Sequence, residues 1–202
     1  MIIKVNQLSK RFNYQYVFKQ IDFEFNIGNA YAVLGPNGSG KSTFIKHLIA
    51  YITPSEGSIN WYLNQKSIHL DALHHHFSIA APYIDLIEDL TLMEMLHFHF
   101  KFKQSTCSIA EIVQELKLEK HSNKPLKLFS SGMKQRVKLA LNFFSDVPVL
   151  IFDEPCTNLD QDGIDWYLIQ INKIKDRLLI VASNDEREIS FCNEHLNLSS
   201  YK

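Results

Sequence analysis

The stretch from Gly35 to Thr43 reads GPNGSGKST and follows the pattern G-x-x-x-x-G-K-S, between an apolar run and apolar residues at helical spacing. Glycine adopts backbone conformations that a Cβ forbids, so successive N–H groups can converge on an anion at a helix N-terminus. Lys41 would reach the outer phosphates, and Ser42 would give its hydroxyl to Mg²⁺, which prefers oxygen ligands. The residues predicted to bind a nucleotide here are Gly35, Pro36, Asn37, Gly38, Ser39, Gly40, Lys41, Ser42 and Thr43.

Two acidic residues, Asp153 and Glu154, follow the wholly apolar run PVLIF at 148–152. Such a run is typical of a strand buried on both faces of a parallel sheet, and open α/β sheets present their ligands at the carboxyl ends of strands. Asp153 there can hold Mg²⁺, and Glu154 can act as a base toward an attacking water. Alone, these residues could be an ordinary exit from a strand, but a phosphate loop in the same chain favours the functional interpretation.

A third stretch, FSSGMKQRVKLAL at 129–141, begins a helix with two serines and a glycine. Ser130 is well placed as the N-cap, and a bare helix N-terminus is itself an anion site. The spacing alone favours an ordinary helix cap over a binding site.

Alternating strand and helix patterns surround these stretches and predict an α/β fold with a parallel sheet. A hairpin is expected around Asn64 and Gln65. The predicted strands are 2–5, 21–25, 31–34, 58–63, 66–70, 77–81, 148–152 and 178–182. The first predicted helix begins near Lys41 and ends around 53–57. The other predicted helices are 91–98, 109–116, 130–144, 164–174 and 185–192.

The stretch from about residue 88 to about residue 145 is mostly helical and interrupts the alternation, so we expect a helical subdomain inserted into one domain spanning 1–202. Thr91 and Glu94 have the spacing of a capping box at its start. Residues 97–103, HFHFKFK, alternate with period 2 and fit either a strand or a helix, and we favour the helix. The consecutive histidines at 74–76 share no ligand spacing and indicate a solvated loop.

Composition limits the function classes. The 202 residues suit one domain, and a formal net charge of −1 gives no reason to expect a nucleic-acid partner. Three scattered cysteines fit a reducing, cytoplasmic compartment. The N-terminus lacks the apolar core of a signal peptide, and no segment approaches the ~18 apolar residues that a membrane span needs. Work at a membrane would therefore require another chain.

Taken together and in order, the motifs resemble those of the ATP-binding cassette (ABC) ATPases over essentially the whole chain. GPNGSGKS resembles the Walker A loop, FSSGM the signature, IFDEP the Walker B motif, and Thr157–Asp160 (TNLD) the D-loop. The resemblance is to stand-alone bacterial transporter cassettes. It implies a P-loop NTPase (RecA-like) core with an N-terminal antiparallel β portion and an inserted helical subdomain.

The resemblance also implies roles for particular residues. ATP with Mg²⁺ would be the bound ligand, with Ser42 and Asp153 at the metal, and the residues expected to be catalytic are Glu154, Lys41 and Asn184. The signature residues would contact a nucleotide bound by a second cassette, with the D-loop residue near that interface. These residues are Ser130, Ser131 and Gly132 of the signature and Asp160 of the D-loop.

An aromatic residue that stacks on adenine would lie in RFNYQY at 11–16. Phe12 is at the matching place, with Tyr14 and Tyr16 as alternatives, since stacking requires only a flat apolar face. A half-buried hairpin without a ligand is the competing interpretation.

Four positions in three motifs depart from the family pattern. Ser131 and Met133 stand where glycine and glutamine are usual in the signature. Pro82 stands where a glutamine usually faces Mg²⁺, and proline has neither a side-chain amide nor an N–H; Glu88 or Asp85 would have to replace it. Asn184 replaces the usual switch histidine, and it can hydrogen-bond a phosphate but cannot take up a proton near neutral pH. We expect slow hydrolysis rather than none.

The implied function is an ATP-hydrolysing subunit of an ABC transporter. It would dimerise around two MgATP, as a homodimer or a heterodimer, and drive a separate integral-membrane permease from the cytoplasmic, inner face of the cell membrane. One alternative is a soluble ABC ATPase without a permease. A further alternative, motivated by Pro82 and Asn184, is a slow or non-hydrolysing nucleotide sensor.

Overall fold

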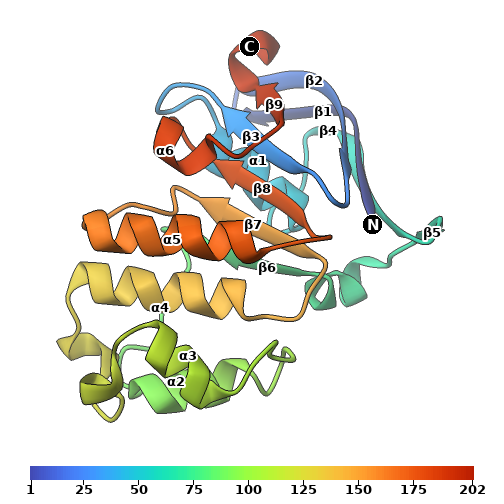
Figure 1. Ribbon diagram of the computed structural model, residues 1–202. Helices are drawn as coiled ribbons and strands as arrows, with labels where there is room; N and C mark the ends of the chain where they lie inside the picture. Colours follow the sequence, from blue (N-terminus) through green and yellow to red (C-terminus); the bar gives the residue numbers. More distant parts are fainter.

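A parallel sheet runs through the centre of the molecule, with helices on both faces and an antiparallel sheet packed beside it (Figure 1). This computed structural model describes all residues from 1 to 202. The central sheet has five strands in the order β6-β7-β8-β3-β9, and every pairing in it is parallel. The strands are β3 (Ala30–Leu34), β6 (Phe77–Ala80), β7 (Val149–Asp153), β8 (Leu178–Ala182) and β9 (Glu194–Asn197).

The antiparallel sheet is built mainly from the N-terminal part of the chain and has the order β2-β1-β4-β5. Its strands are β1 (Ile2–Phe12), β2 (Gln15–Asn26), β4 (Glu56–Leu63) and β5 (Lys66–Ser67). The hairpin expected around Asn64 and Gln65 is present, and both residues have the positive φ, 49° and 65°, that a type I′ turn requires.

The helices divide between the core and a separate layer at the bottom of Figure 1. The helices are α1 (Lys41–Leu48), α2 (Leu92–His99), α3 (Ile109–Glu115), α4 (Ser131–Phe143), α5 (Gln161–Lys173) and α6 (Glu186–Ile189). Helices α2, α3 and α4 enclose their own cluster of 13 buried residues. That cluster gives the inserted helical stretch a hydrophobic core distinct from those against the sheet.

The apolar strands of the central sheet are buried from both sides. Neighbouring residues of β7 alternate between two cores, with Ile151 facing α1 and the antiparallel sheet and Phe152 facing α4 and α5. All residues of β7 and β8 are buried, as their unbroken apolar runs predicted. These strands therefore lie between two hydrophobic cores. None of the helices is both long and apolar enough to cross a bilayer.

The structure corrects several predicted boundaries. The strand predicted over 66–70 stops at Ser67, because a 3₁₀ helix follows at Leu70–His75 and carries most of the histidine run on its exposed surface. The ambiguous stretch 97–103 continues helix α2 to His99 and then turns. Strand β9 was missed, since only Leu196 of its four residues is buried and EHLN has no strong strand signal.

Candidate nucleotide-binding site

The predicted site residues follow three neighbouring strands of the central sheet. Val33 of β3 pairs with Ala182 of β8, and Ala182 in turn pairs with Asp153 of β7. Because the strands are parallel and these residues are level, the segments after them leave from the same edge. The phosphate loop, Asp153 with Glu154, and Asn184 therefore meet at one place, although more than a hundred residues of sequence separate the loop from the other two segments.

The loop between β3 and α1 has the backbone of an anion cradle. Gly38 and Gly40 have φ of 78° and 104°, in the region that favours glycine, and Gly40 is the residue directly before helix α1. The Lys41 side chain is 5% exposed and folds back over the loop, where its Nζ donates to the carbonyl oxygen of Gly35 at 2.7 Å. The ammonium is thus held next to the N–H groups at the start of α1.

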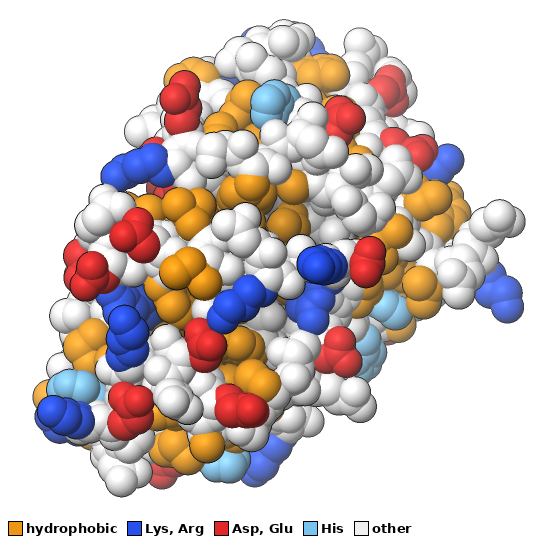
Figure 2. Space-filling view, in the orientation of Figure 1, with side chains coloured by type: hydrophobic (Ala, Val, Ile, Leu, Met, Phe, Trp, Pro, Cys, Tyr) orange, Lys and Arg blue, Asp and Glu red, His pale blue; other side chains and the backbone are white.

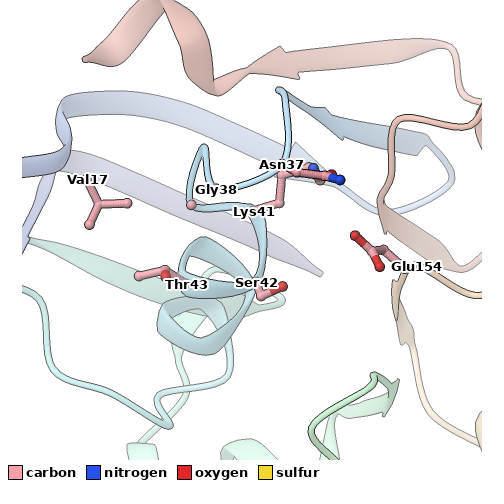
Figure 3. A pocket seen from close by; sticks show the side chains of 8 residues that line it. Val17, Asn37, Gly38, Lys41, Ser42, Thr43 and Glu154 are labelled. Carbon is pink, nitrogen blue, oxygen red and sulfur yellow. The ribbon is translucent and has the colours of Figure 1, made fainter.

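A cavity of about 310 Å³ opens over this loop (Figure 3). Figure 3 shows Glu154 across the cavity from Gly38 and Val17, with its carboxylate pointing toward Lys41 and Ser42. The residues that line the cavity are Val17, Asn37, Gly38, Gly40, Lys41, Ser42, Thr43 and Glu154. All but Val17 were predicted from the sequence.

The residues beside the loop fit a magnesium ion. Asp153 is 1% exposed, and neither of its carboxylate oxygens has a hydrogen-bond partner. Burial raises the pKa of Asp153, and the nearby Ser42 hydroxyl and the Lys41 charge offset part of that rise. A buried carboxylate with free oxygens next to a hydroxyl is the donor set that a hard cation prefers, and a cation there would favour the ionised form.

Glu154 sits in an unusual backbone conformation that aims its side chain. Its φ is 49°, which is uncommon for a residue other than glycine, and its N–H donates to the carbonyl of Ala182 at 2.9 Å. Glu154 lines both the loop cavity and a neighbouring one that contains Asn184. The Asn184 Nδ2 donates to Asn37 Oδ1 at 3.4 Å, which brings this amide to the phosphate loop.

The signature residues lie elsewhere in the chain. Ser130 caps α4, since its side chain accepts from the N–H of Met133 at 3.2 Å, and Ser131 and Gly132 form the first turn. A Cβ on Gly132 would lie 2.9 Å from the carbonyl oxygen of Asn158 in the D-loop, so the two motifs pack closely. None of the three signature residues lines either cavity at the phosphate loop.

Asp160 joins the D-loop to the signature helix. It caps α5 by accepting from the Gly163 N–H at 2.9 Å, and it also pairs with Arg136 of α4 at 2.9 Å. These two donors hold the pKa of Asp160 below its usual range.

The residue predicted to stack on adenine does not line the cavity. Phe12 ends β1 next to the hairpin turn, is 55% exposed, and has the Lys10 ammonium 5.0 Å from its ring centroid. Val17, on the following strand, lines the cavity instead. A role for Phe12 stays a prediction. The hairpin itself is present, with Phe12 paired to Gln15.

The fold and this edge define a P-loop nucleotide-binding protein: a parallel sheet, a glycine loop opening a helix, and acidic residues after the neighbouring buried strand. A sequence profile of the ABC transporter family matches residues 18–157, which is more than half of the chain. The chain therefore belongs to the ABC transporter family.

Relatives and solved structures agree with this assignment. The chain is 32% identical over 166 residues to the ABC transporter ATP-binding protein YcbN of Bacillus subtilis, covering 81% of this chain and 54% of that protein. It is 29% identical to YybJ of the same organism, covering 98% of this chain and 93% of that one. A solved ATP-binding subunit of an ABC transporter superimposes with a TM-score of 0.84 at 27% identity, covering 98% of this chain and 85% of that chain.

Proposed function

We propose that this chain is the ATP-hydrolysing subunit of an ABC transporter and that two cassettes, identical or different, close around two MgATP. One observation carries the proposal. The phosphate loop, both acids and Asn184 share one sheet edge, while Ser130, Ser131 and Gly132 line no part of the cavities at that edge. A signature helix with a free N-terminal turn is then available to the nucleotide of a second chain.

Within each site, the residues would act by positioning and electrostatics, with water as the nucleophile. Lys41 and the loop amides would hold the phosphates, and Ser42 and Asp153 would hold Mg²⁺. The ion would neutralise charge that develops on the phosphates. Glu154 would accept the proton of the attacking water, for which its inward-pointing carboxylate is suitably placed.

The helical layer supplies a surface for a permease. Apolar side chains lie among charged ones over the lower part of the face drawn in Figure 2. Large apolar residues of the layer and of the loop leading into it are exposed, and the rings of Phe98 and Phe102 contact each other edge to face. These exposed residues are Ile84, Ile87, Phe98, Phe102 and Leu128. Exposed apolar groups of this kind mark interaction sites, so we place the permease contact here, at the cytoplasmic face of the membrane.

Phosphate release from ATP tests the catalytic part. Wild type should release phosphate at a rate that rises more than linearly with protein concentration, since each site needs two chains. Glu154→Gln should bind ATP equally well but hydrolyse it at least about a hundredfold more slowly, the order expected for loss of a general base. If both proteins are equally slow at every concentration, a self-sufficient homodimer is excluded.

The membrane part has its own test. Isolation from gently solubilised membranes should bring down a multi-span protein with the cassette. Recovery of the cassette only in the soluble fraction would favour an ABC ATPase without a permease.

A nucleotide sensor is the second candidate, and Asn184 is the observation that favours it. Its amide contacts the phosphate loop through Asn37, but it cannot exchange a proton near neutral pH. Asn184→His should raise phosphate release severalfold if the asparagine limits hydrolysis. If wild type hydrolyses ATP and Asn184→His hydrolyses it at the same rate, the sensor interpretation is contradicted.

A further inference from the structure

The loop after β6 brings Tyr83 to the magnesium edge. Ala80, the last residue of β6, pairs with Phe152, the residue before Asp153. The segments that follow these two strands therefore leave the sheet side by side. A turn closed by the N–H of Ile84 and the carbonyl of Ala81, at 3.1 Å, contains the two residues between them. In that turn Pro82 is exposed, whereas the side chain of Tyr83 is turned inward and half-buried.

The surroundings of Tyr83 belong to the nucleotide site. The ammonium of Lys46, on the same helix as Lys41 and Ser42, lies 4.1 Å from the centroid of the Tyr83 ring. Lys46 also acts electrostatically on Asp153. Burial, and then the charge of Asp153, raises the pKa of Tyr83 well above its usual value, so the phenol stays protonated and can donate.

Two orphaned groups face this edge. The Tyr83 hydroxyl is buried and has no hydrogen-bond partner, and the two carboxylate oxygens of Asp153 have none either. Burying a polar group without a partner is unfavourable, and such groups in a folded protein usually have a role. The charge of Asp153 acts on the Tyr83 hydroxyl, so the free donor and the free acceptor lie in the same part of the molecule, and a rearrangement on ligand binding can bring them together.

The other polar residues of this loop are engaged elsewhere. Glu88 is paired with Lys134 at 2.7 Å, and Asp85 lies 3.8 Å from Lys138, both on the signature helix. These acids, which the sequence suggested as replacements for an amide at position 82, are drawn toward α4. Tyr83 is the remaining candidate in the loop.

We infer that Tyr83 is a positioning residue of the magnesium site: its hydroxyl donates to the Asp153 carboxylate and holds it in place when MgATP is bound. This inference rests on the proposed nucleotide-binding function. Tyr83 would thus support the magnesium site from the position after Pro82, which stands where the family pattern has a glutamine that faces Mg²⁺.

Binding of ATP with and without magnesium tests the inference. We would measure ATP affinity calorimetrically in excess EDTA and in saturating Mg²⁺ for wild type, Tyr83→Phe, Tyr83→Gln and the control Tyr62→Phe. Tyr62 is a half-buried tyrosine on β4 of the antiparallel sheet, so its variant removes one hydroxyl away from the site. In EDTA all four proteins should bind alike.

Magnesium should separate the variants. The gain in affinity that Mg²⁺ gives wild type should fall roughly tenfold in Tyr83→Phe, the effect of one hydrogen bond to a charged group. It should stay at the wild-type level in Tyr62→Phe. Tyr83→Gln should recover most of the gain, because an amide can donate in the same place.

Thermal unfolding without ligand distinguishes positioning from a structural role. Tyr83→Phe removes an unsatisfied hydroxyl, so the melting temperature of the free protein should stay or rise. A lowered melting temperature, or a Mg²⁺-dependent gain equal to that of wild type, would overturn the inference. Failure of wild type itself to bind ATP in EDTA would instead refute the proposed function, and this inference with it.

Discussion

Replacing Gly40 with alanine should damage the phosphate loop by a mechanism that can be separated into two parts. Gly40 has a φ of 104°, outside the region that residues with a side chain adopt easily. In addition, a Cβ there would lie 2.4 Å from Cγ1 of Val17, which real contacts do not reach. Gly38 is a matched control, because its φ is 78° but a Cβ would meet nothing within 4 Å.

The two substitutions should therefore differ in size. Backbone strain costs about 1–2 kcal/mol at either position, and loss of glycine's freedom in the unfolded chain returns about 0.4–1 kcal/mol. Overpacking against Val17 adds about 1–3 kcal/mol for Gly40→Ala alone. The net cost is therefore about 1–4.6 kcal/mol for Gly40→Ala and at most about 1.6 kcal/mol for Gly38→Ala. At about 2–4 °C per kcal/mol for a chain of this size, the melting temperature should drop by roughly 2–18 °C for Gly40→Ala and by at most roughly 6 °C for Gly38→Ala.

A double substitution identifies the contact. Val17→Ala deletes Cγ1, so Gly40→Ala combined with Val17→Ala should regain about 1–3 kcal/mol relative to the sum of the single changes. Thermal and urea unfolding of the four proteins, followed by circular dichroism, measures the coupling. Additive effects, or equal destabilisation by the Gly38 and Gly40 changes, would refute the geometry of the loop described above.

Other predictions concern the acids and the buried histidines. Glu154→Gln should trap a nucleotide-bound dimer that elutes earlier than wild type in size-exclusion chromatography with ATP, and monomeric elution would argue against a dimer. Asp153→Asn should abolish most of the increase in ATP affinity that Mg²⁺ gives, while ATP binding in EDTA persists. If the increase is the same as in wild type, Asp153 does not bind the metal. Burial lowers the pKa of His47 to about 4 and that of His99 to about 4. The unfolded chain takes up these protons first, so the free energy of unfolding should fall as the pH drops from about 6.5 toward 4. The loss should reach up to about 3 kcal/mol for each histidine, and His47→Gln should flatten that slope in urea titrations, whereas an unchanged slope would contradict it.

The buried framework was predictable because its physical signal is strong. Unbroken apolar runs such as β7 and β8 fit only a sheet covered on both faces, and their carboxyl ends fix where the polar residues that follow must lie. That is why the meeting of the phosphate loop with Asp153 could be anticipated from spacing alone. The capping box at Thr91 was equally readable, and α2 begins there with reciprocal hydrogen bonds to Glu94. The second capping box, formed by Ser108 and Glu111 at the start of α3, was not predicted although it has the same spacing.

The contacts made by loop and edge residues could not be predicted in the same way. The alternation of β2 indicates which face Val17 lies on, but not that this face borders the phosphate loop, since that depends on how two sheets pack. Tyr83 lies in an aperiodic turn, and a position-by-position comparison with the family pointed to Pro82. A side chain one place further along reaches the site because the turn points it inward.

The distance between the signature turn and the chain's own phosphate cavity has a genetic consequence. If every working site is assembled from halves of two polypeptides, a variant damaged at Lys41 and another damaged at Ser130 spoil different halves. Either variant alone forms only homodimers in which both sites are inactive. When the two variants are mixed, they also form heterodimers. In one of the two sites of a heterodimer, the intact phosphate loop of one chain meets the intact signature of the other, so two inactive strains or preparations would complement one another.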